Sequence, residues 1–250
     1  MPRLFTISVF LNLALTAALC AAVASPASAS NVDAQREIFQ RVYPDVERGD
    51  WSVVTNLPAE EQRQLEDYLL WPDLRATWFR ATLRRAPRQD VAAFLEHYDT
   101  LKPARELRYR FALELVRRGE LDAYFEIYQA YYQGREIVKL DCLALQAELA
   151  AGRPQRITVR ARELWLIGSS QLEECDPIFA YLDKANLLGT ADYRQRYQLA
   201  INEREFSLAR WLAKFIDSAH VDEAANWQAA GNNPQQFLEA RRETTSTPAR

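Results

Sequence analysis

The chain has 250 residues and a formal net charge of −3, with 48% hydrophobic and 26% charged residues. This length suits one large domain or two small ones, with a core that needs neither metals nor many disulfides. Only 7 glycines argue against Gly-rich phosphate loops, and the near-neutral charge argues against a dedicated nucleic-acid-binding role. The two histidines, His97 and His220, leave little room for a zinc site, so we expect no metal and no cofactor.

The N-terminus has the pattern of an export signal. One positive charge lies in residues 1–3, no charged residue follows in 4–23, and small residues stand at Ala27 and Ala29. We therefore expect a signal peptide over residues 1–29, cleaved after Ala29. The alternative is an uncleaved anchor, because about 20 apolar residues can span a bilayer. No later segment is long and apolar enough to cross, so we expect no stable membrane insertion after cleavage.

The rest of the chain shows the apolar periodicity of helices. Single Gly or Pro residues interrupt the pattern at short intervals, and no segment has the alternation of a convincing strand. Val53–Val54 and Ile157–Val159 are the best strand candidates, and both are too short. The apolar stripes include Leu107, Phe111, Leu115 and Val116; Leu140, Leu143, Ala147 and Ala150; and Leu199, Phe206, Leu208, Trp211, Leu212 and Phe215. The sequence therefore predicts an all-α protein.

Faint internal similarity refines this prediction. Residues 94–98 resemble residues 124–128, and Arg48–Trp51 resembles Arg118–Leu121. Such similarity favours an open-ended α-superhelix or solenoid of short antiparallel helix pairs, with an irregular helical bundle as the alternative. We expect the superhelical domain to cover residues 30–218. The segment 219–250, rich in Asn and polar residues, is expected to be a truncated continuation and a polar tail.

Two cysteines remain after the expected loss of Cys20 with the signal peptide. Cys142 and Cys175 in an exported chain predict one disulfide, and two buried free thiols are the alternative. Because a disulfide reduces the conformational entropy of the unfolded chain, a bridge between these cysteines would stabilise the fold by roughly 3–4 kcal/mol.

Three motifs lie close together around these cysteines. Cys142 opens one predicted helix, Leu164-Trp165-Leu166 ends the next, and Cys175-Asp176-Pro177-Ile178-Phe179 opens a third. This constellation resembles the N-terminal superhelical domain of the soluble lytic transglycosylases, and the resemblance extends over residues 32–215. Leu143 and Leu172 depart from the family, which often has an aromatic residue and a proline at these places.

The resemblance implies structural roles for these residues rather than catalytic ones. Trp165 is expected to pack beside the disulfide, and Asp176 to cap a helix whose first residue is Pro177. Leu164 and Phe179 complete the set of expected fold determinants.

Enzymes of this family carry catalysis in a separate C-terminal lysozyme-like domain. That domain has a Glu-Ser pair, a Gly-Leu-Met-Gln segment and an Ala-Tyr-Asn-Ala-Gly segment. This chain contains no Glu-Ser or Tyr-Asn dipeptide, and its one methionine is Met1. We therefore expect no catalytic residue in it and no enzymatic activity of the chain as it stands. The acid pairs Glu60–Glu61 and Glu173–Glu174 lie at predicted helix starts, where the helix dipole favours them.

These observations give two functional hypotheses. The first is a non-catalytic scaffold portion of a periplasmic peptidoglycan lytic transglycosylase, whose family cleaves the β-1,4 bond between N-acetylmuramic acid and N-acetylglucosamine with a 1,6-anhydro product. The second is a stand-alone periplasmic solenoid that binds a cell-wall enzyme, peptidoglycan or an envelope protein. The expected partners are peptidoglycan glycan strands or a separate catalytic or cell-wall protein, without nucleic acid.

Overall fold

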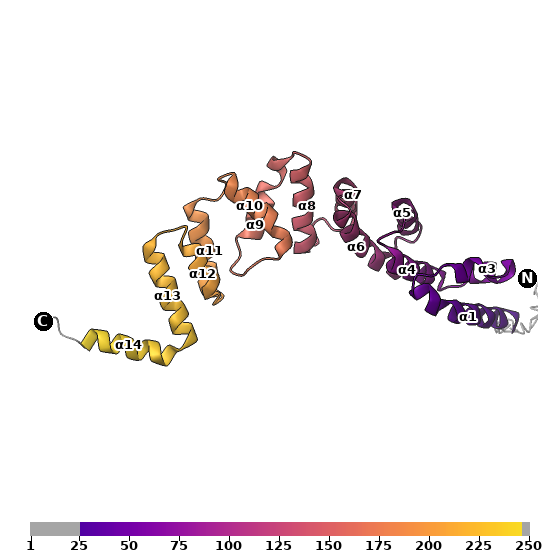
Figure 1. Ribbon diagram of the computed structural model, residues 1–250, viewed down its shortest axis with the longest axis horizontal. Helices are drawn as coiled ribbons and strands as arrows, with labels where there is room; N and C mark the ends of the chain where they lie inside the picture. Colours follow the sequence, from indigo (N-terminus) through magenta and orange to yellow (C-terminus); the bar gives the residue numbers. More distant parts are fainter. Residues whose placement is uncertain (1–25, 247–250) are drawn as a thin grey trace, which may run out of the picture. The chain divides into compact units, whose positions relative to one another are not determined.

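The structure, a computed structural model, describes residues 26–246 (Figure 1). In that range it contains fourteen α-helices, two 3₁₀ turns and no β-strand, so the all-α prediction is confirmed. Val53–Val54 is helical, and Ile157–Val159 leads into a helix instead of forming a strand. Most of the expected signal peptide lies outside the described residues, and its cleavage after Ala29 stays a prediction. None of the described helices has both the length and the hydropathy needed to span a membrane.

The chain divides into two compact units, Met1–Ala104 and Arg105–Arg250, here called unit 1 and unit 2. The described helices of unit 1 are α1 (Pro26–Glu47), α2 (Ser52–Thr55), α3 (Ala59–Glu66), α4 (Trp71–Thr82) and α5 (Arg88–His97). Helix α6 (Lys102–Arg117) begins at the boundary. Unit 2 continues with α7 (Leu121–Tyr131), α8 (Val138–Ala150), η1 (Pro154–Arg156), α9 (Thr158–Trp165), η2 (Glu173–Cys175), α10 (Asp176–Lys184), α11 (Thr190–Asn202), α12 (Phe206–Ala213), α13 (Ser218–Asn232) and α14 (Pro234–Ser246).

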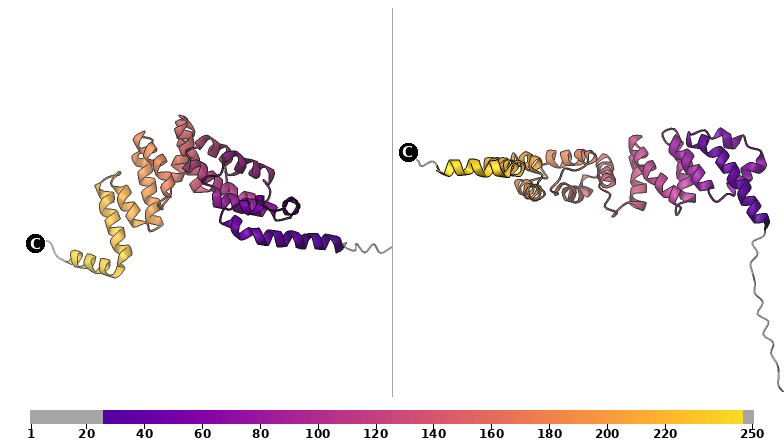
Figure 2. Two further views of the ribbon diagram at one scale, coloured as in Figure 1. Left: turned by 45° about the vertical axis from the view of Figure 1, so that its right-hand side comes forward. Right: turned by 90° about the horizontal axis from the view of Figure 1, so that it is seen from below.

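In unit 2 the helices pack mainly on their neighbours in the chain, whereas in unit 1 the long first helix packs on several helices that follow it. In unit 2, α7 packs on α8, α11 on α12, α12 on α13 and α13 on α14. In unit 1, α1 contacts α2, α3 and α4 in turn. Figures 1 and 2 show this serial order within the units. The predicted solenoid class, in which short helices stack in sequence, is therefore confirmed.

Glycine ends helices at matching places in the two units. Gly49 follows α1 with φ of +90°, and Gly119 follows α6 with φ of +76°. Side chains are disfavoured in this left-handed region, which is why glycine is the usual residue just past a helix end. The similarity between Arg48–Trp51 and Arg118–Leu121 thus corresponds to one kind of turn used twice.

The core of unit 2 is built around α8. This helix is buried on nearly all sides, and its Cys142 is bonded to Cys175 of η2 with 4.9 Å between their Cα atoms. The side-chain amide of Gln146 also donates to the carbonyl oxygen of Glu174 at 2.6 Å. The disulfide and this hydrogen bond together hold η2, and the start of α10 behind it, against α8.

Candidate functional site

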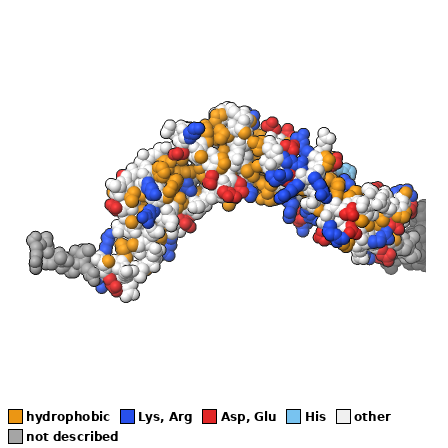
Figure 3. All heavy atoms as spheres, viewed as in Figure 1, with side chains coloured by type: hydrophobic (Ala, Val, Ile, Leu, Met, Phe, Trp, Pro, Cys, Tyr) orange, Lys and Arg blue, Asp and Glu red, His pale blue; other side chains and the backbone are white. Residues whose placement is uncertain are grey.

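Unit 2 contains a cleft of about 580 Å³ where α9, α10, α11 and α12 meet. Hydrophobic side chains reach the surface in this part of the unit (Figure 3). The cleft is lined by aromatic side chains from all four helices and by a small number of charged groups. Apolar walls with a few convergent polar groups are the usual composition of a binding site for a small or extended ligand.

Four of the aromatic rings form a continuous ladder from the buried floor to the rim. Trp165 is 2% exposed, and its ring meets Tyr193 edge-to-face at 5.1 Å between centroids. Tyr193 stacks on Phe215 at 4.6 Å, and Phe215 meets Trp211 at 4.9 Å. Each contact has the spacing of a favourable aromatic pair, so the rings hold one another in place.

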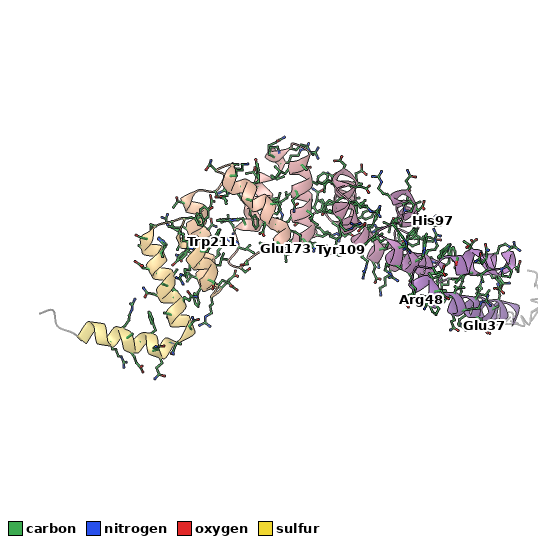
Figure 4. All side chains as sticks on the ribbon, viewed as in Figure 1. Glu37, Arg48, His97, Tyr109, Glu173 and Trp211 are labelled. Carbon is green, nitrogen blue, oxygen red and sulfur yellow. A yellow bond between two sulfur atoms is a disulfide. The ribbon has the colours of Figure 1, made fainter. Side chains whose placement is uncertain are left out.

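The outer end of the ladder is partly exposed to solvent. Trp211 and Phe215 belong to the apolar stripe that indicated a helix in the sequence, and they are 44% and 42% exposed. The apolar stripe is wider than the buried face of α12. Ala209, Leu212 and Ala213 are buried, whereas Trp211 and Phe215 lie at the edge of that face. Figure 4 labels Trp211 beside α11 and α12.

A buried arginine lies at the floor of the cleft. Arg196 of α11 is 5% exposed, and its guanidinium lies over the Trp165 ring at 4.7 Å from the centroid. Its Nε donates to the carbonyl oxygen of Ile167 and its Nη2 to that of Ser169, both at 3.2 Å. Burial lowers the pKa of Arg196 to about 10, which leaves the group charged at neutral pH.

Two carboxylates lie at the exposed rim. Asp183 accepts a hydrogen bond from the Tyr193 hydroxyl at 3.0 Å. Burial, followed by this hydrogen bond, raises the pKa of Tyr193 to about 12. The second carboxylate is Asp176, whose expected capping role is wrong: α10 begins at Asp176 itself, and no side-chain hydrogen bond caps it. The reason is that η2 runs directly into α10, so the preceding Cys175 already has helical backbone angles.

A glycine lets the chain pass closely beneath the cleft. Gly168 is buried, and a Cβ atom placed on it would lie 2.6 Å from the carbonyl oxygen of Leu199. A side chain therefore cannot fit without moving the backbone of α11. Because Gly168 separates the two carbonyl groups that Arg196 binds, this close approach also brings them to the guanidinium.

The remaining sequence-predicted residues lie in or next to the core. Leu164 and Trp165 are buried in one cluster with Cys142 and Cys175, and Phe179 packs against that cluster while lining the cleft. Pro177 is exposed in the first turn of α10. Some of the fold-determining residues predicted from the sequence therefore form the inner wall of the cleft. The sequence did not predict four other lining residues: Tyr193, Arg196, Trp211 and Phe215.

Three members of the two acid pairs Glu60–Glu61 and Glu173–Glu174 form ion pairs, and Glu61 does so with Arg41. Glu60 accepts from Arg63 at 2.5 Å within the first turns of α3, and Glu174 pairs with Lys139 at 2.5 Å. Glu173, its neighbour in η2, is labelled in Figure 4. Between residues 26 and 246, no group of His, Cys, Asp and Glu side chains is arranged to hold a metal ion.

Unit 1 has a smaller hollow, of about 410 Å³, next to α4 and α5. Arg75 lines it together with His97, whose ring meets Tyr98 edge-to-face at 4.4 Å. The Arg75 guanidinium lies among four aromatic rings, at centroid distances of 5.0 Å from Trp51, 5.9 Å from Trp71, 5.5 Å from Trp78 and 5.2 Å from Phe79. His97 is exposed at this hollow, and its contact with the Tyr98 ring holds it at the end of α5.

Comparison with known proteins identifies relatives with similar sequences. No family model matches the chain. It is 27% identical over 234 residues to the soluble lytic murein transglycosylase of Escherichia coli (strain K12), covering 93% of this chain and 35% of that protein. It is 25% identical over 221 residues to the protein of the same name from Salmonella typhimurium (strain LT2), covering 88% of this chain and 33% of the relative.

Solved structures agree with the sequence comparison. The 70-kDa soluble lytic transglycosylase in complex with bulgecin A matches with a TM-score of 0.64 and 26% identity, over 81% of this chain and 32% of that chain. An inactive mutant of the lytic transglycosylase Slt from Pseudomonas aeruginosa matches with a TM-score of 0.66 and 25% identity, over 83% and 32%. The chain is a relative of the soluble lytic murein transglycosylases. It spans about a third of the length of the curated relatives that it matches.

Proposed function

We propose that this chain is a non-catalytic, periplasmic portion of the lytic transglycosylase machinery, which binds peptidoglycan glycan strands through the cleft of unit 2. The resemblance of the motifs around Cys142 and Cys175 to the family's N-terminal superhelical domain supports the assignment. The similarity to proteins named for their action on murein supports the choice of ligand class.

The observation that carries the proposal is the aromatic ladder with its exposed end. Trp211 and Phe215 leave large apolar ring surfaces in contact with water at the mouth of a concave site. Sugar rings have apolar C–H faces that stack on such rings, while their hydroxyl and acetamide groups need hydrogen-bonding partners. Asp176, Asp183 and Arg196 supply acceptors and a donor along the same walls.

The non-catalytic part of the proposal rests on sequence. The Glu-Ser, Gly-Leu-Met-Gln and Ala-Tyr-Asn-Ala-Gly motifs of the family's catalytic domain do not occur in these 250 residues. The role left for the described helices is to hold or orient glycan rather than to break it.

Sedimentation with isolated peptidoglycan sacculi tests binding. We expect the purified chain to co-sediment with sacculi, and the substitution Trp211→Ala to reduce the bound fraction several-fold. Trp227→Ala is the matched control, because Trp227 is 46% exposed on α13 and does not line the cleft. Equal binding by both variants, or no binding by the parent chain, would remove the cleft as a glycan site and leave the protein-binding module as the better hypothesis.

Mass spectrometry of the supernatant tests the absence of catalysis. We expect no release of 1,6-anhydro-muropeptides above the level seen with an unrelated exported helical protein. Release that depends on a carboxylate of this chain would show that it is an enzyme.

A further inference from the structure

We propose that Arg196 binds a carboxylate of the ligand, so that the cleft selects acidic, carboxylate-bearing glycan over neutral N-acetylglucosamine oligomers. This inference rests on the proposed function and adds the chemical group that the site recognises. The carboxylate has two sources in peptidoglycan: the lactyl group of a muramic acid without a peptide, or the carboxyl groups of a stem peptide.

The first step is the count of hydrogen-bond donors on Arg196. A guanidinium carries five N–H groups. Two of them donate to the carbonyl oxygens of Ile167 and Ser169, and the face of the group lies on Trp165. Neither hydrogen of Nη1 has a partner in the described part of the chain. Nη1 is not fully buried, so it is open to the water of the cleft.

The second step is the missing counter-charge. The described residues of unit 2 include four buried carboxylates, and each of them has an arginine partner: Glu114 with Arg117, Asp141 with Arg160, Glu148 with Arg153 and Asp192 with Arg162. Arg196 is equally buried, yet its partners are neutral carbonyl groups and an aromatic ring. Burying a charge is costly unless it is paired. An anion that enters the cleft would therefore form the ion pair with Arg196 that the fold itself does not supply.

The third step concerns the two carboxylates at the rim. Asp176 and Asp183 are exposed, so water and salt screen their repulsion of an anionic ligand, whereas the buried guanidinium is screened much less. Their oxygens accept hydrogen bonds from hydroxyl and amide groups. The walls therefore fit a ligand with a carboxylate at the floor, ring faces against Trp211 and Phe215, and N–H or O–H groups toward the rim.

The test changes the ligand first, because Arg196 also ties down the Ile167–Ser169 segment and its replacement can disturb the fold. Four probes are titrated into the chain: neutral N-acetylglucosamine tetramer, N-acetylglucosaminyl-N-acetylmuramic acid, the same disaccharide with its lactyl carboxyl converted to a primary amide, and the disaccharide tetrapeptide. The indole N–H signals of Trp165 and Trp211 in nuclear magnetic resonance spectra report binding in the cleft.

We expect the free acid to bind at least about tenfold more tightly than its amide and than the neutral tetramer. A hydrogen bond between charged partners is worth at least this factor. Arg196→Gln should bind acid and amide equally, and Arg196→Lys should recover part of the difference. Arg194→Gln is the control, because Arg194 is exposed on the same helix and does not line the cleft. If the tetrapeptide is the tighter ligand, and this depends on Arg196, the stem peptide supplies the carboxylate.

Failure of this inference is distinct from failure of the proposed function. If all four probes bind with the same affinity, the cleft is a glycan site that ignores charge, and the role of Arg196 as a carboxylate receptor is wrong. If neither the probes nor sacculi bind, the proposed function itself fails and this inference with it.

Discussion

The two units bury different kinds of residues. Among the described residues of unit 1, the buried polar side chains are uncharged: Gln35, Thr77 and Thr82. The described residues of unit 2 include four buried carboxylates and two buried arginines in addition to its apolar core. Unit 1 is therefore held by apolar and aromatic packing, whose strength follows buried area. Unit 2 also depends on paired charges, whose strength depends on both partners being present.

The same contrast separates the two arginines that lie on tryptophan. Arg75 in unit 1 lies among four rings, which surround its guanidinium with apolar and quadrupolar contacts. Arg196 in unit 2 lies on one ring and faces a cleft more than a third larger. Burial lowers the pKa of both groups. The comparison predicts a packing role for Arg75, which four rings enclose, and is consistent with the proposed receptor role for Arg196, which lies on one ring.

The largest effect is expected from a substitution that disrupts the aromatic packing of unit 1. Phe79 is fully buried, contacts Trp78 and Phe94, and lies beside Arg75. Phe79→Ala should lower the free energy of unfolding of unit 1 by about 3–5 kcal/mol. Phe215→Ala, which removes a half-exposed ring from unit 2, should cost about 1 kcal/mol and weaken sacculus binding instead. Hydrogen exchange followed by mass spectrometry reads each unit separately, and a comparable loss in both units would contradict the contrast.

The second effect is confined to unit 2. Replacing both Cys142 and Cys175 with serine should destabilise this unit by roughly 3–4 kcal/mol, because the unfolded chain regains conformational freedom. Unit 1 contains no part of this bridge and should be unchanged. Urea unfolding with and without reductant measures the effect, and the serine variant should no longer respond to the reductant. A response of unit 1 to reduction would show that the two units do not unfold separately.

The third expected difference between the units is the effect of low pH on their stability. Hydrogen bonds from Arg117 and Arg118 lower the pKa of Glu114 to about 2, from an ordinary value of 4.5. Because the folded-state pKa is the lower one, this stabilisation is complete above pH 4.5 and is lost as the pH falls toward 2. The shift corresponds to at most about 3 kcal/mol.

Glu114→Gln makes this acid effect measurable. The variant should be less stable than the parent at pH 7, and the difference should shrink between pH 4.5 and pH 2 in urea titrations. Glu60→Gln in unit 1 is the control, because Glu60 is fully exposed and its pair with Arg63 is screened by water. A pH-independent difference for Glu114→Gln would mean that packing, not charge, holds this side chain.

Local sequence patterns predicted the helices and their ends well. Glycines after α1 and α6 and prolines before α3 and α5 mark real boundaries, since these residues act on the backbone at their own position. The motif around Cys142, Trp165 and Cys175 likewise predicted a shared core cluster. Such features depend on the residue type and on a short window of neighbours, which is the information that one sequence contains.

The cleft could not be predicted in the same way. Helical periodicity shows that Trp211 and Phe215 extend an apolar stripe, but it does not show which helix, if any, covers each part of that stripe. The environment of Arg196 depends on carbonyl groups 27 and 29 residues earlier in the chain, brought close by Gly168. Capping at Asp176 failed for a similar reason, because the 3₁₀ turn before it was not visible in the sequence. Long-range packing decides these features.

The smallest expected effect is also the sharpest test of the contrast between the two arginines. Arg75→Lys keeps the charge but loses the planar group that stacks between the rings of Trp51 and Phe79. Unit 1 should lose about 0.5–1 kcal/mol of stability, as for a partly exposed cation–π contact, and sacculus binding should not change. Arg196→Lys, by contrast, should weaken binding of the acidic disaccharide, because a lysine cannot donate two parallel hydrogen bonds to a carboxylate. If Arg75→Lys also weakens binding of the acidic disaccharide, enclosure by four rings does not prevent an arginine from acting as a receptor, and the hollow of unit 1 becomes a second candidate for the same ligand.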